Sequence, residues 1–301
     1  MSGDRFLVTG ALGCLGAWVA TLLVREGAAV VSYDLGEDDH RLRLIATPDE
    51  IDAIAVVRGD VTSLEQLLET LADHSITHVV HLAALQVPFV KANPPLGAQV
   101  NVVGTVNVFE AARRHELATP VAYASTAAVY NAEGARIPHT LYVVFKTANE
   151  GTARIYWADD GVASVGIRPY TVFGAGRDQG ITSSPTVAME AATRREAYHI
   201  TFGGRTELHY APDVARGFIA AARSSPRDAL TFDFPGTSVH MSDVVAAIEA
   251  AEPEAAGLIT FDDVQLPFPA ELPGERLDVP VTPFDDAVHE TIEIFRAATA
   301  G

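Results

Sequence analysis

A glycine-rich turn close to the N-terminus limits the possible folds of this chain more than any other feature. The run "RFLVTG" has the composition of a buried strand, and "TGALGCLG" follows it directly. Gly10 permits a tight turn, Gly13 lets the backbone approach a pyrophosphate, and Gly16 allows close packing of the next helix, expected over 14–26. The first N–H groups of that helix are free to bind phosphate oxygens. The turn therefore predicts a dinucleotide site, in preference to a turn kept only for packing.

An acidic residue ends the second expected strand, "AAVVSYD", and indicates which dinucleotide binds. Asp34 follows Gly16 by eighteen residues, where a carboxylate accepts hydrogen bonds from the ribose 2′- and 3′-hydroxyls. A 2′-phosphate would meet Asp34 and the acids at 37–39, so NAD is favoured over NADP, unless Asp34 is merely a surface-loop acid. The predicted cofactor contacts in this region are Gly10, Gly13, Cys14, Leu15, Gly16, Asp34 and Leu35.

The order of apolar runs predicts the fold class. Strand-like and helix-like stretches alternate through the first half of the chain, with further helices expected over 63–73, about 96–115 and from about 284. This alternation predicts an α/β protein with a Rossmann-type, doubly wound parallel sheet. After Gly174 the sequence becomes loop-like and rich in proline, which predicts a small, irregular C-terminal substrate lobe. We expect a cofactor domain over 1–172 with about 205–238, and a lobe over about 173–204 and 239–301.

Composition excludes several classes of partner. The chain has 21 Lys and Arg against 39 Asp and Glu, a formal net charge of −18. Such a chain is not expected to bind nucleic acid or an anionic membrane surface. No apolar run reaches the roughly 18 residues of a membrane-spanning helix. The single cysteine, Cys14, cannot form an internal disulfide, so a cytoplasmic location is expected, and no metal site is predicted.

A tyrosine and one of only two lysines share a helix face in "LYVVFKTANEG". Tyr142 and Lys146 are four residues apart and therefore lie one above the other. Hydride transfer between an alcohol and a nicotinamide requires proton transfer at the alcohol oxygen, and a phenol with a pKa of about 10 is a weak base. A nearby ammonium and the positive nicotinamide would lower the pKa of the phenol. The alternative is a buried tyrosine with a lysine that extends to solvent.

Several motifs in order resemble one enzyme family. The glycine turn and Asp34 are followed by "RGDVTS", "VVHLAA", "NVVGTVNVFEAAR", "YASTAAVY", "YVVFK", "RPYTVFGAGR" and "LHYAPDVARGF". Together they resemble the extended short-chain dehydrogenases/reductases, the group of NAD-dependent sugar epimerases, dehydratases and dehydrogenases. The resemblance covers nearly the whole chain and implies NAD as cofactor and a small-molecule substrate.

The resemblance also implies roles for individual residues. Tyr142 would be the general acid/base, Lys146 would tune it and bind ribose, and Thr126, in preference to the adjacent Ser125, would hold the substrate oxygen. His81 and Tyr130 are expected to be structural. The further cofactor contacts implied are Asp60, Val61, Leu82, Ala83, Ala84 and Asn101, and the substrate contacts are Gln86, Ser125, Thr126, Thr171 and Arg177.

A homodimer is implied by the same resemblance. In this family two helices of each subunit, here 96–114 and 143–158, form a four-helix bundle across the dimer interface. These segments hold more apolar residues than one sheet contact requires. The residues expected at the interface are Val102, Val106, Phe109, Phe145, Ile155 and Trp157.

The sequence departs from nucleotide-sugar enzymes at the substrate side. Thr171 replaces a usual asparagine, Thr206 stands where an arginine for the diphosphate is expected, and the loop 131–139 is short. These differences favour a small substrate without a nucleotide, with Arg177 as a binding group for a carboxylate or phosphate. We therefore expect an NAD-dependent oxidoreductase acting on a small sugar, sugar acid or polyol. The alternatives are an epimerase that retains its NAD and a non-catalytic NAD-binding protein.

Overall fold

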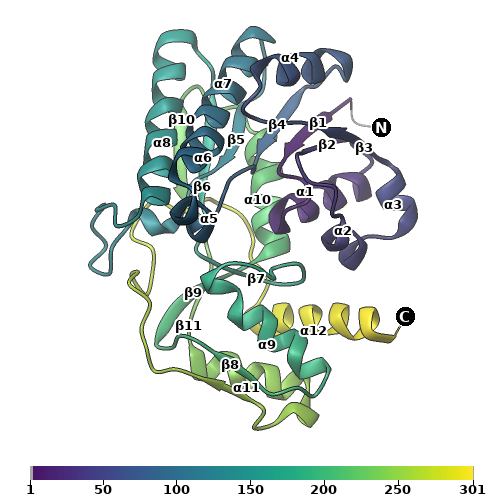
Figure 1. Cartoon of the computed structure of the whole chain (residues 1–301), viewed down its shortest axis with the longest axis vertical. Helices are drawn as coiled ribbons and strands as arrows, with labels where there is room; N and C mark the ends of the chain where they lie inside the picture. The colour runs from purple at the N-terminus through teal and green to yellow at the C-terminus, as the bar shows by residue number, and fades with distance from the viewer. Residues whose placement is uncertain (1–2, 301) are drawn as a thin grey trace.

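A seven-stranded parallel sheet forms the centre of the molecule (Figure 1). The computed structural model describes residues 3–300. The strand order is β10-β6-β5-β4-β1-β2-β3, and every neighbouring pair is parallel. The order reverses between β1 and β4, which is where ligands bind in folds of this class. The strands are β1 (Arg5–Thr9), β2 (Ala29–Asp34), β3 (Ile54–Arg58), β4 (His78–His81), β5 (Val121–Ala124), β6 (Ser164–Arg168) and β10 (Ala229–Asp233).

Helices cover both faces of this sheet because successive side chains of each strand point to opposite sides. Phe6 and Val8 of β1 pack in one apolar cluster with α1 and α10, whereas Leu7 packs in another with α4, α7 and α8. The first group of helices is α1 (Cys14–Arg25), α2 (His40–Ile45), α3 (Pro48–Asp52) and α10 (Ala211–Arg223). The second is α4 (Leu64–Asp73), α5 (Val87–Ala92), α6 (Pro94–Ala98), α7 (Gly104–Arg114) and α8 (Leu141–Asp160).

A smaller lobe lies beyond the carboxyl ends of the central strands (Figure 1). It contains a three-stranded sheet, β11-β9-β7, and a two-stranded sheet, β12-β8. The strands are β7 (Thr171–Phe173), β8 (Tyr198–Ile200), β9 (Arg205–Tyr210), β11 (Thr237–His240) and β12 (Ile259–Phe261), and the helices are α9 (Ser184–Thr193), α11 (Met241–Ala251) and α12 (Phe284–Ala300). The predicted domain boundaries remain a prediction. They assign residues 205–238 to the cofactor domain, whereas β9, within that range, pairs in the small sheet.

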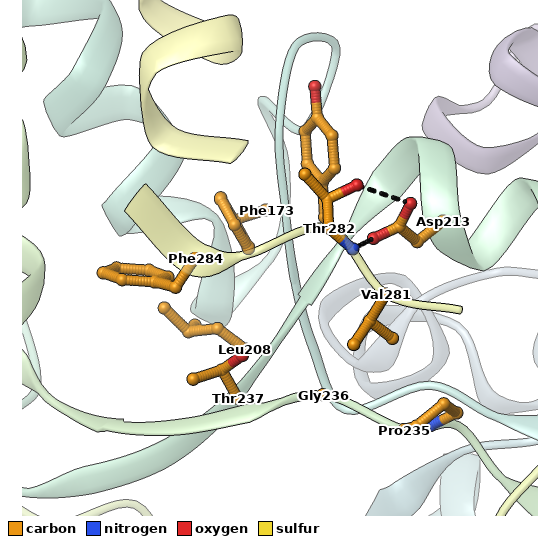
Figure 2. Close-up of a pocket in the computed structure, with 10 residues that line it drawn as sticks. Phe173, Leu208, Asp213, Pro235, Gly236, Thr237, Val281, Thr282 and Phe284 are labelled. Atoms are coloured by element: carbon orange, nitrogen blue, oxygen red, sulfur yellow. Dashed lines mark hydrogen bonds between the residues drawn. The ribbon is translucent and has the colours of Figure 1, made fainter. Parts of the chain in front are cut away.

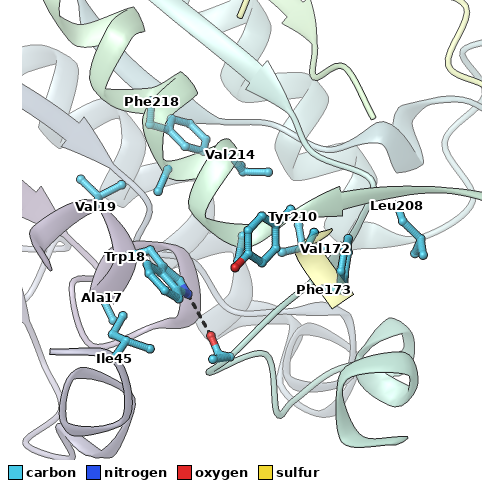
Figure 3. Close-up of a cluster of buried hydrophobic side chains, with 14 of the residues drawn as sticks. Ala17, Trp18, Val19, Ile45, Val172, Phe173, Leu208, Tyr210, Val214 and Phe218 are labelled. Atoms are coloured by element: carbon cyan, nitrogen blue, oxygen red, sulfur yellow. Dashed lines mark hydrogen bonds between the residues drawn. The ribbon is translucent and has the colours of Figure 1, made fainter. Parts of the chain in front are cut away.

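The core continues from the central sheet into the lobe. Trp18 of α1 and Phe218 of α10 belong to the same buried cluster as Phe173 and Tyr210 of the small sheet (Figure 3). The Trp18 indole Nε1 also donates a hydrogen bond to the carbonyl of Ala175, 2.9 Å away, which fixes the loop after β7. The lobe is therefore held by apolar contacts as well as by the chain connections.

The predicted fold class is confirmed, and most expected helices are present within a residue or two. The helix expected over 96–115 consists of α6, a π-helical segment Gln99–Val103 and α7. Phe109 was expected to contribute to the dimer interface, but it is fully buried within the subunit, where its ring packs against Tyr123 and Tyr156 at centroid distances of 5.7 and 5.5 Å. Among residues 3–300, no helix is both long and apolar enough to cross a membrane.

A buried carboxylate anchors the chain where it returns to the lobe before α12. Asp213, at the start of α10, accepts hydrogen bonds from the backbone N–H of Thr282 at 2.6 Å and from its hydroxyl at 2.9 Å (Figure 2). The cavity beside this contact measures only about 10 Å³. Because that volume holds at most one water, the site is structural rather than a substrate site.

Replacement of Asp213 should destabilise the protein. Asp213→Ala removes the hydrogen bonds from the Thr282 N–H and hydroxyl, together with the ion pair with Arg216, so we expect the free energy of unfolding in urea to fall by about 2 to 4 kcal/mol. Thr282→Ser, which retains both donors, is the control and should remain close to wild type. An Asp213→Ala protein as stable as wild type would contradict the anchoring role.

Candidate functional site

A cleft of about 780 Å³ lies at the carboxyl ends of the central strands, under the lobe. The glycine-rich turn, the acid after β2, the loop after β4 and the first turn of α8 all line it. Most of the predicted site residues are therefore brought together, although they come from widely separated parts of the sequence. Among residues 3–300, no group of three or more His, Cys, Asp or Glu side chains is placed to hold a metal ion.

The glycine turn has the shape that phosphate binding requires. Gly10 has φ of +69°, and a Cβ on it would lie 2.6 Å from the backbone N of Ala83. A Cβ on Gly16 would lie 2.1 Å from the carbonyl oxygen of Gly10, so α1 packs directly on the turn. Gly13 caps α1 without a side-chain hydrogen bond to the helix, and its Cα borders the cleft. The free N–H groups of α1 consequently face the place where a pyrophosphate fits.

The carboxylate of Asp34 is fixed at the ribose end of the cleft. Its Oδ2 accepts from the N–H of Leu12 at 3.0 Å and its Oδ1 from the N–H of Gly36 at 3.1 Å. Each carboxylate oxygen retains capacity to accept from a ribose hydroxyl. The arrangement fits the ribose of NAD, and Leu35 lines the cleft beside it.

The expected adenine contacts are also at the cleft. Asp60 and Val61 line it, and the Asp60 carboxylate accepts from the N–H of Thr62 at 2.8 Å, which shapes the turn after β3. Val61 packs against Gly104, where a Cβ would approach its Cγ2 to 2.8 Å. Leu82, Ala83 and Ala84, expected under the dinucleotide, also line the cleft.

Asn101 supports the cleft from behind and does not line it. It is buried, with Oδ1 accepting from the N–H of Leu85 at 2.7 Å and Nδ2 donating to the Leu85 carbonyl at 2.9 Å. The expectation that Asn101 contacts the cofactor directly is therefore replaced by a positioning role. The signal for that role is not visible in the sequence, because it depends on the loop after β4 folding back over the π-helical segment.

His81 is structural, as predicted. Thr105 donates its hydroxyl proton to the Asn101 carbonyl, so its oxygen accepts from His81 Nε2 at 3.0 Å, and Thr9 donates to His81 Nδ1 at 2.7 Å. Burial, together with the charge of Lys146, lowers the pKa of His81 to about 3. A neutral, fully hydrogen-bonded imidazole away from the cleft surface is not an acid/base group.

Thr126, Tyr142 and Lys146 come together at one end of the cleft. Thr140 caps α8 by accepting from the N–H of Val143 at 3.2 Å, which places Tyr142 in the first helical turn. The Lys146 Nζ donates to the Ala124 carbonyl at 2.7 Å and lies 5.8 Å from the centroid of the Tyr142 ring. The strand end of β5, which Thr126 follows, and the start of α8 are thereby tied together.

The protonation behaviour of this group differs from the expectation. Burial raises the pKa of Tyr142, while the charge of Arg177 and the Thr126 hydroxyl oppose that rise. Burial also lowers the pKa of Lys146 to about 8. The protein's own groups therefore do not produce the lowered phenol pKa that the Tyr–Lys spacing suggested, because desolvation outweighs the neighbouring charges.

Ser125 lines the same region, but its hydroxyl has another partner. Its Oγ donates to Oε1 of Glu150 at 2.6 Å, beneath the cleft. Glu150 is in turn paired with Arg168 at 2.7 Å and with Arg136. Ser125 thus belongs to a buried ionic network, which leaves the Thr126 hydroxyl as the better partner for a substrate oxygen.

Four of the five predicted substrate residues line the cleft, and one does not. Arg177 donates from Nη2 to the Thr182 hydroxyl at 3.2 Å, and its buried Nε has no hydrogen-bond partner among residues 3–300. Gln86 lines the cleft beside Gly180. Thr171 as a substrate residue was wrong: it is fully buried, and its hydroxyl lies 3.1 Å from that of Thr206 in the small sheet.

An apolar wall at the substrate end was missed. Phe268, from the proline-rich segment after β12, packs edge-on against Tyr170 at 5.7 Å and near His139 at 5.6 Å. The Tyr170 hydroxyl donates to the Pro269 carbonyl at 3.0 Å, which holds this segment over the cleft. Further apolar lining comes from Val87, Pro88, Phe89, Ile181, Leu266 and Pro267.

Solved structures share this architecture over almost their full length. The L-threonine dehydrogenase from Clostridium difficile superposes with a TM-score of 0.84 at 18% identity. The superposition covers 99% of each chain. The UDP-glucose 4-epimerase of Thermus thermophilus in complex with NAD superposes with a TM-score of 0.75 at 22% identity, over 98% of this chain and 99% of that one. At such identities the similarity concerns the fold.

Two plant proteins are similar in sequence. UDP-glucuronate 4-epimerase 4 of Arabidopsis thaliana is 28% identical over 279 residues, 82% of this chain and 63% of the relative. UDP-glucuronate 4-epimerase 2 of the same plant is 31% identical over 186 residues, 58% of this chain and 43% of the relative. The chain thus spans only 43% to 63% of the length of these two relatives.

The family model gives the broadest match. Residues 6–230 match the model of the NAD-dependent epimerase/dehydratase family, a range that includes the glycine turn, Asp34, Thr126, Tyr142, Lys146 and Arg177. The match includes the central sheet except for the first residue of β1 and the last residues of β10. This chain belongs to the NAD-dependent epimerase/dehydratase family, and its cofactor is NAD.

Proposed function

We propose that the protein is an NAD-dependent oxidoreductase that acts on a secondary hydroxyl or ketone of a small sugar, sugar acid or related polyol. The observation that carries the proposal is that Thr126, Tyr142 and Lys146 line the same cleft as the glycine turn and Asp34. A cofactor-binding protein without catalysis would have no need for a buried lysine beside a half-buried tyrosine in this cleft.

The three side chains divide the work of proton transfer. Bound NAD supplies the hydride acceptor or donor at its nicotinamide ring. Thr126 holds the substrate oxygen by a hydrogen bond, and Tyr142 accepts the hydroxyl proton at its phenolate oxygen during oxidation or returns it during reduction. Lys146, with a pKa of about 8, is largely protonated near neutral pH, and we expect its charge, together with that of the nicotinamide, to favour the phenolate form against the effect of burial.

The charged groups of the cleft favour a small substrate. Among residues 3–300, the only Lys and Arg side chains that line it are Arg41, Lys146 and Arg177. Arg41 is paired with Asp178, and Lys146 is bound to the Ala124 carbonyl. Arg177, whose Nε is buried and unpartnered, is the cation available to a substrate carboxylate or phosphate.

An epimerase that retains its NAD is the second candidate, because the two plant relatives are named as 4-epimerases. However, the structure has few groups in the cleft that could bind a nucleotide diphosphate. Thr206 is fully buried against Thr171, and Arg205 donates to the Ser238 carbonyl at 3.0 Å outside the cleft. These contacts support a substrate without a diphosphate, and therefore the first candidate.

A homodimer and a cytoplasmic setting belong to the proposal. Exposed apolar side chains gather on the segment 96–103 and on α8; they are Leu96, Val103, Leu141, Val144 and Ile155. Of the residues predicted for this face, Val102, Val106, Phe145 and Trp157 are partly buried and Ile155 is 60% exposed. The single cysteine supports a reducing compartment.

The mass in solution tests the dimer. Burial of an apolar face of this kind should give a particle of twice the 32.0 kDa chain at micromolar concentration in sedimentation or light scattering. Ile155→Arg should shift the mass toward the monomer, because it places a charge in the apolar interface. Arg154→Ala, a change at a neighbouring exposed position, is the control. A wild-type monomer would contradict the proposal.

The cofactor balance separates the two candidate activities. The enzyme is incubated with NAD and a panel of uronates, aldoses, polyols and nucleotide sugars. One of the small substrates should produce NADH, because a dehydrogenase transfers the substrate hydride to NAD and releases the reduced cofactor. The absorbance of NADH measures this directly. Isomerisation of a nucleotide sugar without net NADH would establish the epimerase instead.

Tyr142→Phe should abolish most of the activity and leave the fold intact. The change removes one oxygen and keeps the ring, so turnover should fall roughly 10²–10⁴-fold while NAD affinity is retained. Lys146→Met should weaken NAD binding as well as turnover, because it removes the ribose contact that the family resemblance implies for this lysine. Tyr156→Phe is the matched control, since Tyr156 lies on the same helix and its hydroxyl donates to Glu110 away from the cleft. Near-wild-type turnover of Tyr142→Phe would remove Tyr142 from the mechanism.

A further inference from the structure

Two chain segments meet across the cofactor end of the cleft. One is residues 35–41, the connection from β2 together with the first two residues of α2, and the other is the loop after β7, residues 174–180. Arg41 from the first and Gly176 and Asp178 from the second line the cleft together. The contact joins parts of the chain more than 130 residues apart, and neither residue type nor spacing in the sequence indicates it.

One guanidinium group makes most of the connection. Arg41 donates from Nη2 to Oδ1 of Asp178 at 2.7 Å, from Nε to the Gly176 carbonyl at 3.1 Å, and from Nη1 to the Leu12 carbonyl at 3.1 Å. Leu12 belongs to the glycine-rich turn, and its N–H is bound to Asp34. Arg41 therefore ties the turn that binds the cofactor to the loop on the other side of the cleft.

A histidine completes the contact. His40 Nε2 lies 2.8 Å from Oδ2 of Asp178, and its Nδ1 lies 2.9 Å from Oδ2 of Asp38. Both oxygens of the Asp178 carboxylate are thus engaged from the opposite segment. The far side of the loop is fixed independently by the hydrogen bond from Trp18 to the Ala175 carbonyl (Figure 3). Asp178 is consequently the part of the loop that can be released without disrupting the core.

This bridge lies beside the predicted pyrophosphate position. The charges of Arg177, Arg41 and Asp178 all act on the thiol of Cys14, the first residue of α1. Cys14 follows Gly13 at the helix N-terminus, where the phosphates of NAD fit. A dinucleotide that extends from Asp34 to Tyr142 must pass this point, so the bridge and the cofactor share the same stretch of the cleft.

We propose that Asp178, held by Arg41 and His40, is a positioning residue that closes a bridge over the bound dinucleotide and must be released before NAD or NADH can leave. The proposal rests on the cofactor site described above and adds to it the step that sets the cofactor's residence time. For a dehydrogenase, which exchanges its cofactor at every turnover, opening of such a bridge contributes to the turnover rate.

The test measures release of NADH from the full-length protein by stopped-flow fluorescence after mixing with excess NAD. Asp178→Ala should accelerate release at least about tenfold, the size expected for loss of a charge-assisted hydrogen-bonded pair. Asp178→Asn retains the shape of the side chain and should give an intermediate rate. The matched control is Glu50→Gln, which removes the charge from the pair of Glu50 with Arg25, 2.8 Å apart and outside the cleft. Its release rate should equal that of wild type.

The possible outcomes distinguish failure of the bridge proposal from failure of the proposed cofactor site. Unchanged release from a folded Asp178→Ala protein that binds NADH would overturn the bridge and leave the site intact. Slower association with unchanged release would also overturn it, since the loop would then organise the empty site rather than close over the filled one. A wild-type protein that binds no NADH would overturn the cofactor site itself.

The bridge should also respond to pH through His40. The charged groups that face His40 are Asp178, Asp38 and Arg41, and the hydrogen bonds to Asp178 and Asp38 raise its pKa. Because protonated His40 stabilises the closed bridge, that contribution is complete below the ordinary histidine pKa and is lost as the pH rises through the raised value. NADH release from wild type should therefore accelerate a few-fold across this range, and His40→Gln should abolish the acceleration. A pH profile unchanged by His40→Gln would contradict a role for His40.

Discussion

The close approach of backbone at Gly10 is the constraint on which the rest of the site depends. Its N–H donates to the Tyr33 carbonyl at 2.9 Å, which joins the end of β1 to the end of β2. Its Cα lies against the backbone of Ala83 after β4, and its carbonyl lies under Gly16 of α1. Three strand ends and one helix therefore meet within the reach of a single residue that has no side chain. A side chain there would separate the strands and misplace the free N–H groups of α1.

The proposed catalytic end depends on a buried ionic network rather than on glycine. Arg168 pairs with Glu150 at 2.7 Å and with Asp233 at 3.1 Å, and Glu150 accepts from Ser125 beside Thr126. Burial alone would raise the pKa of Glu150, but its hydrogen bonds and charge interaction with Arg168 outweigh this and lower it. Such networks contribute little net stability, yet their geometry is strict because an unpaired partner is costly. The network thus fixes the strand end that carries Thr126.

The parts predictable from sequence are those encoded by local patterns. The glycine turn, Asp34 and the spacing of Tyr142 and Lys146 are short-range signals, and strand–helix alternation implies the parallel sheet. Thr171 and Phe109 were misplaced because their environments depend on distant partners, Thr206 and Tyr123. The raised pKa of Tyr142 has the same origin: residue spacing reveals a neighbouring charge, whereas desolvation depends on everything packed around the ring.

The substrate end of the cleft is built by segments without periodicity, and one of them also belongs to the cofactor end. Arg177 stands between Gly176 and Asp178, the two residues that Arg41 binds. The proposed binding group for a substrate anion is therefore mounted on the loop that is tied to the glycine turn. Because the guanidinium of Arg41 contacts both sides, any shift of the turn on cofactor binding would reach Arg177 through hydrogen bonds of about 3 Å. Cofactor binding and substrate orientation are consequently coupled by the same few contacts, and a substitution in the loop should affect both.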